Sequence, residues 1–220
     1  MLKIPQIIKM VQDKTRLIEA LALTAQNFCR KGWNPATSGN LSVLLSRIPF
    51  KLAITPTGIN KSSLQSDQIV IVDENGTRIE GKGNPSSDIK LHLAVLKSKP
   101  EINSVFHIHS IWNTLLSSEN HPGDKVVLQQ YELLKALRKN YSPSEKIYIP
   151  ILQSQGDQDQ LSKEFSRILK EDLDIHGILL KQHGLYSWGE NLQSACQRVE
   201  ALEFLFEVQA RQLQIRKPQI

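Results

Sequence analysis

The stretch Val105-Phe106-His107-Ile108-His109-Ser110 (VFHIHS) places two histidines one residue apart inside an apolar run. Side chains of an extended strand point alternately to opposite faces, so His107 and His109 face one side while Phe106 and Ile108 face the other. Residues two apart on one strand face are separated by roughly 6.5–7 Å, so imidazoles that lean together can share one metal ion. We therefore predict a strand that carries two candidate metal ligands.

The sequence on both sides of this strand predicts one α/β domain over residues 1–220. Short apolar runs bounded by turn signals are expected to form strands at 41–45, 51–55, 69–73 and 146–152, with a strand pair across 176–188 that turns near His183-Gly184. Apolar residues at helical spacing predict helices at about 17–28, 85–100, 130–139, 158–171 and 191–213, and a loop is expected at 120–124. Regular βαβ alternation is absent from this order. We therefore expect a central sheet that is mostly antiparallel or mixed and is flanked by helices.

Composition and charge exclude several classes of function. The 220 residues are 40% hydrophobic and 22% charged, which is typical of a globular domain. The net charge of +5 is spread along the chain without a block of like charge, so we expect no nucleic-acid partner. No G-x-G-x-x-G or Walker motif is present, which argues against a nucleotide-binding enzyme.

The N-terminus and the cysteines indicate the expected compartment. The segment MLKIPQIIKMVQDK lacks the long apolar region of a signal peptide, and no later run approaches transmembrane length. The two cysteines, Cys29 and Cys196, lie in segments that we expect to be helical, where buried thiols are a better interpretation than a disulfide. We therefore expect a cytoplasmic protein without a membrane partner.

A third histidine could join the pair on the strand. Of the six histidines, His92 falls in a predicted helix with a structural role, and His121 lies in the 120–124 loop. His176 and His183 both precede glycine. We favour His183, because it interrupts an apolar run, and expect His176 to be exposed at a strand entry. Three imidazoles that leave a fourth position open are typical of a catalytic zinc site rather than a structural one.

Three polar stretches near glycines could bind a phosphate group. They are TSGNLS (37–42), TPTGINKSS (55–63) and PSSD (85–88), of which the last opens a predicted helix. Helix N-termini and glycine-bearing turns present backbone N–H groups to anions, and Lys61 could add a positive charge. The same residues also form ordinary turns and caps, so each stretch alone favours a structural role.

The order of these motifs resembles that of the class II aldolase/adducin family, from about residue 15 to 212. The resemblance implies the three-layer fold of that family, a homotetramer with each active site near a subunit boundary, and one Zn²⁺ per subunit. His107, His109 and His183 match the family's metal ligands. The positions that match its phosphate-binding pattern are Gly39, Asn40, Thr57, Gly58, Ser86 and Ser87.

Within the family, the chain resembles the dehydratase branch. The features that carry this resemblance are HGLYSWG (183–189) followed by a long helix, and QYELLKAL (130–137). It implies zinc-dependent loss of water from the sugar phosphate 5-methylthioribulose 1-phosphate, a step of methionine salvage, with Glu132 as the acid/base. Asp88 stands where the aldolases carry a catalytic glutamate and is one methylene shorter. Without the resemblance, Glu132 would be interpreted as an exposed carboxylate in the first turn of a helix.

Three alternatives remain open from the sequence. A sugar-phosphate aldolase or epimerase of the same family would share the metal and phosphate sites but act at a carbon–carbon or carbon–hydrogen bond. A non-catalytic adducin-like module would keep the fold as an interaction surface, which the intact histidines disfavour. A two-metal phosphate-ester hydrolase would need an Asp-rich ligand set that this sequence lacks.

Overall fold

Nine strands form one sheet in the computed structural model, which describes residues 4–215 except 139, 143 and 155–156. The strand order is β4-β3-β2-β1-β5-β9-β8-β7-β6. β7 and β8 pair in parallel, and the other neighbouring pairs are antiparallel. The strands are β1 (Asn40–Arg47), β2 (Phe50–Ile54), β3 (Val70–Val72), β4 (Arg78–Glu80), β5 (Ser104–Ile108), β6 (Lys125–Gln129), β7 (Lys146–Leu152), β8 (Gly177–Leu180) and β9 (Gly184–Gly189). The predicted mostly antiparallel, mixed sheet is confirmed.

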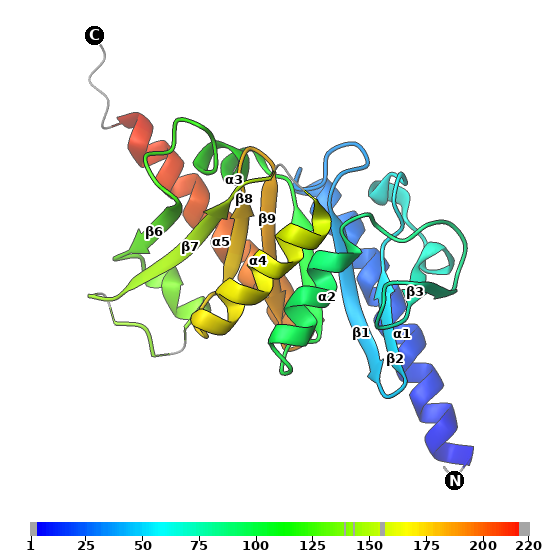
Figure 1. Ribbon diagram of the computed structural model, residues 1–220. Coiled ribbons are helices and arrows are strands. Elements are labelled where there is room, and N and C mark those ends of the chain that lie inside the picture. Colours follow the sequence, from blue (N-terminus) through cyan, green and yellow to red (C-terminus); the bar gives the residue numbers. More distant parts are fainter. Residues whose placement is uncertain (1–3, 139, 143, 155–156, 216–220) are drawn as a thin grey trace.

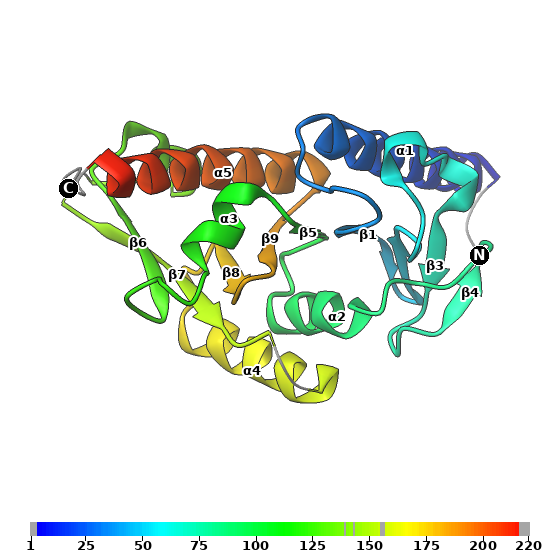
Figure 2. The ribbon, with the colours of Figure 1, turned by 90° about the horizontal axis from the view of Figure 1, so that it is seen from above.

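Helices cover both faces of this sheet and create three layers (Figure 2). α1 (Ile4–Arg30), α3 (Ile111–Leu116) and α5 (Leu192–Ile215) lie on one face, and α2 (Ile89–Ser98) and α4 (Gln158–Glu171) lie on the other. Each face has its own apolar core: Phe106 and Ile108 belong to the core under α1 and α5, whereas Val105 belongs to the core under α2 and α4. The alternation predicted for β5 therefore holds, and His107 shares the face of Val105.

The register of β5 brings distant parts of the chain next to His107. β5 lies between β1 and β9 near the middle of the sheet, and all its residues are buried. Asn40 of β1 is paired with His107 on one side, and Tyr186 of β9 is paired with it on the other. The TSGN and HGLYSWG motifs, far apart in sequence, thus meet at the histidine strand β5, which Figure 2 shows between β9 and β1.

One predicted helix is wrong. The segment expected to be helical over 130–139 forms only a short 3₁₀ helix, η3 (Glu132–Ala136), and residue 139 lies outside the described part of the chain. Gln130 has a positive φ of 64°, so the regular helix cannot include it. The segment belongs to the long connection between the antiparallel neighbours β6 and β7, residues 130–145, in whose described part only a brief 3₁₀ turn forms.

The other expected elements are present, and several were not foreseen. β7 and α4 have the predicted bounds, while α1 begins at Ile4, earlier than its apolar spacing indicated. The sequence did not point to α3, β4 or β6. The ends of the predicted domain, 1–3 and 216–220, lie outside the described residues. Within the described part of the chain, no helix is both long and apolar enough to cross a membrane.

Candidate metal centre

Three histidine side chains meet at one end of the sheet. His107 lies on β5, His109 follows that strand directly, and His183 lies in the turn between β8 and β9. Each offers one ring nitrogen within 4.8 Å of the others. The Nε2 atoms of His107 and His109 are only 2.8 Å apart, and the ring centroid of His183 is 4.6 Å from that of His109. The structure thus brings together the three predicted ligands.

Neighbouring groups orient the His107 ring. Its Nδ1 lies 3.1 Å from the carbonyl oxygen of Leu185, which can only accept, so Nδ1 carries the proton and Nε2 keeps its lone pair. The ring of Tyr186 stacks on it at 4.0 Å between centroids. A Cβ atom at Gly184 would lie 2.8 Å from His107 Cε1, so the position after His183 has no room for a side chain.

The electrostatic setting keeps these rings neutral. Burial, together with the two neighbouring imidazoles, lowers the pKa of His107 well below its usual value. Burial and His183 lower the pKa of His109 to about 4, and burial lowers that of His183. Neutral imidazoles at neutral pH present lone pairs, and three such nitrogen donors suit Zn²⁺ or a similar transition-metal ion. The residues present therefore fit the metal that the resemblance implied.

Two other histidines lie away from this cluster. The predicted exposure of His176 is wrong: the side chain is only 6% exposed, just before β8. Burial and the nearby Arg198 and Arg138 lower its pKa to about 3. His121 lies in the 120–124 loop as predicted, with its Nδ1 3.1 Å from the carbonyl oxygen of Gly123.

Asp88 reaches the metal centre from the start of α2. It is the N-cap residue of that helix, yet its side chain makes no capping hydrogen bond. Its Oδ2 instead lies 3.9 Å from His107 Nε2 and accepts a hydrogen bond from Asn40 Nδ2 at 2.8 Å. Its Oδ1 accepts from Gln158 Nε2, on α4, at 3.1 Å. The carboxylate is therefore held by two amide groups beside the histidines.

The loops predicted to bind phosphate lie together beside Asp88. The backbone N–H of Thr57 donates to Asn84 O at 3.1 Å, and Pro56 forms an isolated bridge with Pro85, so the TPTG and PSSD segments are adjacent. The TSGN segment joins them through the Asn40–Asp88 hydrogen bond. Ser86 and Ser87 immediately precede Asp88 at the start of α2. These loops therefore lie next to one another beside the histidines, with Thr57, Gly58 and Ser87 exposed and Gly39, Asn40 and Ser86 buried.

Two glycines and one lysine shape these loops. Gly39 and Gly58 have φ values of +70° and +71°, which residues with a Cβ rarely adopt. A Cβ at Gly39 would also collide with the Asn34 side chain, so this loop requires glycine. Lys61 is fully buried and donates from Nζ to Thr37 O at 2.8 Å, and burial lowers its pKa. The lysine thus holds the TSGN loop through a hydrogen bond to its backbone.

Glu132 and the histidine cluster of the same chain lie at opposite ends of the sheet. Glu132 follows β6, whose last residue Gln129 pairs with Lys146 at the start of β7, while the end of β7 pairs with Leu180 near His183. Figure 1 shows β6 at the edge of the sheet, beyond β7 and β8. The Glu132 side chain is 82% exposed and forms an ion pair with Lys135. Within one chain, the structure does not bring Glu132 to the metal centre.

Sequence reasoning missed several residues around the centre. Gln158 and Tyr186 contact candidate residues, and a buried Asn34 packs against Gly39. The position of Tyr186 inside HGLYSWG was the one available signal, because strand alternation places it on the same face as residue 184.

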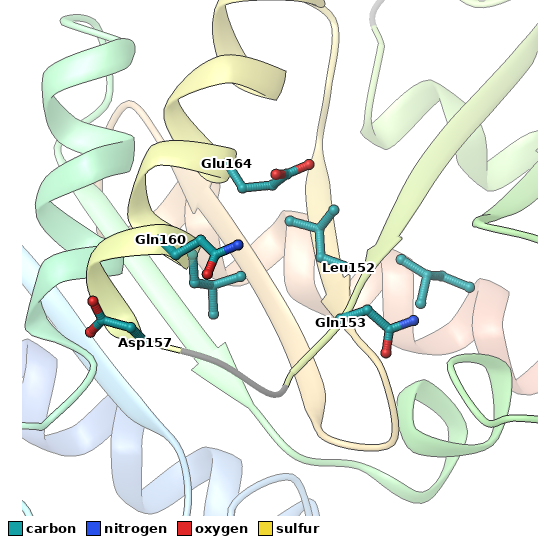
Figure 3. Close-up of a pocket in the computed structure, with 7 residues that line it drawn as sticks. Leu152, Gln153, Asp157, Gln160 and Glu164 are labelled. Atoms are coloured by element: carbon teal, nitrogen blue, oxygen red, sulfur yellow. The ribbon is translucent and has the colours of Figure 1, made fainter.

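A groove of about 310 Å³ lies between β7 and α4, and none of the predicted site residues lines it (Figure 3).

Fold and site together define the class of protein. Residues 19–210 match the family described as Class II Aldolase and Adducin N-terminal domain. The chain therefore belongs to the class II aldolase and adducin family, as its motifs indicated.

The curated relatives specify a branch of that family. The methylthioribulose-1-phosphate dehydratase of Hahella chejuensis (strain KCTC 2396) is 35% identical over 185 residues, 84% of this chain and 88% of that protein. The dehydratase of the same name from Stenotrophomonas maltophilia (strain K279a) is 36% identical over 206 residues, 91% of this chain and 95% of the relative. The chain is thus similar to methylthioribulose-1-phosphate dehydratases over most of its length.

Solved structures share the fold at lower identity. An L-fuculose 1-phosphate aldolase has a TM-score of 0.75 at 22% identity, covering 93% of this chain and 90% of its own. The L-fuculose-1-phosphate aldolase of Thermus thermophilus has a TM-score of 0.72 at 21% identity, covering 93% of this chain and 100% of its own. These comparisons confirm the predicted class II aldolase-like fold.

Proposed function

We propose that this protein is a zinc-dependent hydro-lyase that converts 5-methylthioribulose 1-phosphate to 5-methylthio-2,3-dioxopentyl phosphate in methionine salvage, in the cytoplasm. The observation that carries the proposal is the convergence of three neutral imidazoles beside loops suited to phosphate. The similarity to methylthioribulose-1-phosphate dehydratases along most of the chain favours this substrate over other sugar phosphates.

The chemistry explains why such a site suits this reaction. The substrate has a ketone at C2, so the proton on C3 is acidic once the charge left behind is stabilised. Zn²⁺ held by His107, His109 and His183 would supply a Lewis acid for that charge. The loops around Gly39, Gly58 and the start of α2 would hold the phosphate, and this remote binding fixes C3 against a base.

Glu132 is the proposed acid/base, and it would have to act from a neighbouring copy of the chain. It would take the C3 proton and return a proton to the departing C4 hydroxyl, a contribution of about 10²–10⁴-fold. Because Glu132 is exposed and distant from its own histidines, a homotetramer with active sites at subunit boundaries accounts for both observations. Asp88 would orient the centre from within the same chain.

Exposed apolar residues on adjoining helices support an assembly of several copies. Ile111 and Leu115 on α3 are 71% and 46% exposed, and Phe204 on the neighbouring α5 is 56% exposed. Neighbouring apolar side chains on a surface mark an interaction site when they form one patch. A contact between copies would remove them from water.

A sugar-phosphate aldolase is the second candidate. The carboxylate of Asp88 lies beside the histidines, where aldolases carry a catalytic glutamate, but its side chain is one methylene shorter, which argues against this activity. An aldolase would break a carbon–carbon bond at the same metal centre. Parallel assays with 5-methylthioribulose 1-phosphate and L-fuculose 1-phosphate separate the two activities. We expect turnover of the first substrate, and cleavage of the second alone would replace the proposal.

Metal analysis combined with the dehydration assay tests the proposed function. We expect about one Zn²⁺ per chain in the wild type, and loss of both metal and turnover in His183→Ala. His121→Ala, a loop histidine outside the cluster, is the matched control and should keep both. Unchanged metal content in His183→Ala, or a metal-loaded wild type that does not dehydrate the substrate, would overturn the proposal.

A further inference from the structure

A chain of hydrogen bonds connects the buried His92 to the metal centre. His92 lies on α2, and its Nε2 is 2.5 Å from Asn40 Oδ1 while its Nδ1 is 2.7 Å from Ser42 Oγ. Asn40 Nδ2 in turn donates to Asp88 Oδ2 at 2.8 Å. His92 and Ser42 are fully buried and Asn40 nearly so, so bulk water does not compete for these hydrogen bonds.

The Asp88 carboxylate, the last acceptor, fixes the direction of each hydrogen bond in the series that connects it to Asn40 and His92. The Asp88 carboxylate only accepts, so Asn40 turns its NH₂ group to Asp88 and its oxygen to His92. That oxygen also only accepts, so the proton of the neutral imidazole is on Nε2. Burial lowers the pKa of His92 to about 4, which keeps the ring neutral.

The other ring nitrogen completes the chain. Nδ1 is then an acceptor, and Ser42 Oγ is its donor at 2.7 Å. The alternative acceptor for that hydroxyl, the carbonyl oxygen of Val105, is farther away at 3.3 Å. Donation therefore runs in one direction, from Ser42 through His92 and Asn40 to the carboxylate.

We propose that His92 is a positioning residue of the metal centre. His92 holds the Asn40 amide in the one orientation that donates a hydrogen bond to Asp88. The inference rests on the proposed metal site. Without the His92 donor, the Asn40 amide can rotate and turn its oxygen toward the carboxylate, which removes a hydrogen bond and adds repulsion. Asp88 is 3.9 Å from His107 Nε2, so its displacement changes the surroundings of the ion. The predicted structural role of His92 is thereby extended to the site.

The test measures binding of Co²⁺ to the purified metal-free protein by visible absorption, in two variants that differ by one methylene. The amide nitrogen of His92→Gln reaches the place of Nε2 and can donate to Asn40, whereas that of His92→Asn reaches only the place of Nδ1. We expect His92→Asn to weaken Co²⁺ binding about 10-fold and His92→Gln by less than about 3-fold. Equal losses in the two variants, or no loss in either, would contradict the proposal.

A double-variant comparison distinguishes positioning from packing. If His92 acts through Asp88, then His92→Asn should cost less than about 2-fold in Co²⁺ affinity when Asp88→Ala is already present. A purely structural role would give the same loss in both backgrounds. Additive losses would therefore overturn the proposal, and a strongly reduced loss supports it.

A measurement on the wild type needs no variant to fold. ¹⁵N NMR of the metal-free protein at about pH 7 reports which nitrogen of each imidazole carries the proton, and we expect Nε2–H for His92. An Nδ1–H ring or an imidazolium would overturn this proposal while leaving the proposed function intact. A wild type that binds neither Co²⁺ nor Zn²⁺ would instead remove the proposed function and this inference with it.

Discussion

Glu203 on α5 is a buried residue with a carboxyl group, and the proposed reaction assigns it no role. Its Oε1 accepts a hydrogen bond from Asn113 Nδ2 at 3.0 Å, and Oε2 has no hydrogen-bond partner among the described residues. Asn113 also forms a capping box with Ser110, which follows His109 and is the N-cap residue of α3. Glu203 therefore ties α5 to the helix that starts beside a candidate ligand.

The protonation of Glu203 predicts how stability depends on pH. Burial raises its pKa to about 7, and the polar side chains of Ser110 and Asn113 beside it oppose this rise. Because the folded pKa exceeds the unfolded value near 4.5, the folded state binds the proton more tightly, and stability falls as pH rises from about 4.5 to 7. Glu203→Gln keeps the size of the side chain and the acceptor for Asn113, and removes this dependence.

We expect the free energy of unfolding of Glu203→Gln, relative to the wild type, to rise by about 2 kcal/mol between pH 5 and pH 8. Urea denaturation of the metal-free proteins measures this difference. Glu200→Gln changes a more exposed carboxyl of the same helix and serves as the control, with the wild-type slope expected. A constant difference between Glu203→Gln and the wild type across this range would refute the assignment.

Also at the residue scale, the metal ligands could be predicted from the sequence, but the residues that form hydrogen bonds around the centre could not. His107 and His109 could be predicted from alternation in one strand, and His183 from its place in an apolar run. The hydrogen bonds of His92, Asn40 and Gln158 depend on the packing of α2 and α4 against the sheet, which no local pattern encodes. Such contacts are invisible until the elements are placed.

At the scale of elements, local pattern and position in the fold decided which predictions held. α4 has strong helical periodicity and buries Phe165 and Leu169, so its bounds could be predicted. The segment after β6 has similar apolar spacing, but it must connect two paired strands at the edge of the sheet, and tertiary context overrides its propensity. The capping box that starts α3 pairs Ser110 with Asn113 where the usual motif has Glu or Gln, so neither the capping motif nor apolar periodicity points to this helix.

The turn between β8 and β9 is the element that places the third ligand, and its tight contact with β5 predicts a sensitive position. A Cβ at Gly184 would meet the Ile108 carbonyl oxygen and His107 Cε1. We expect Gly184→Ala to destabilise the fold by about 1–3 kcal/mol, as overpacking does, and to weaken Zn²⁺ binding about 10-fold by displacing the turn. Isothermal titration calorimetry and urea denaturation measure the two effects.

Gly123→Ala is the matched control for this substitution. A Cβ there would meet no atom within 4 Å, so both zinc affinity and stability should stay near the wild-type values. If Gly184→Ala bound Zn²⁺ as tightly as Gly123→Ala does, the turn would not hold the ligand in the way described.

At the scale of the whole molecule, the nine-stranded sheet separates the two groups that the proposed reaction needs. The histidines lie at one end of the central strands, and Glu132 lies beyond β6 at the far edge and the opposite end. The sequence could indicate both groups through the resemblance, but their separation emerges only from the strand order and register. A single chain cannot unite them, whereas a symmetric assembly can.

This separation predicts complementation between two inactive variants. Glu132→Gln keeps the histidine cluster but lacks the base, and His183→Ala keeps the base but lacks a ligand. In oligomers formed from equal amounts of both, about a quarter of the sites combine an intact cluster with an intact neighbouring Glu132, so turnover should recover to about a quarter of the wild-type rate. Unfolding and refolding the mixture together, followed by the dehydration assay, measures this recovery.

The control replaces Glu132→Gln in the mixture by the double variant Glu132→Gln/His183→Ala, which supplies no intact cluster and should restore nothing. Native mass spectrometry verifies that mixed oligomers have formed in both samples. Mixed oligomers that remain as inactive as either parent would show that no site draws Glu132 from a neighbour. Because Glu132 cannot reach the histidines of its own chain, that result would remove it from the reaction and leave Asp88, beside His107, as the acid/base to test next.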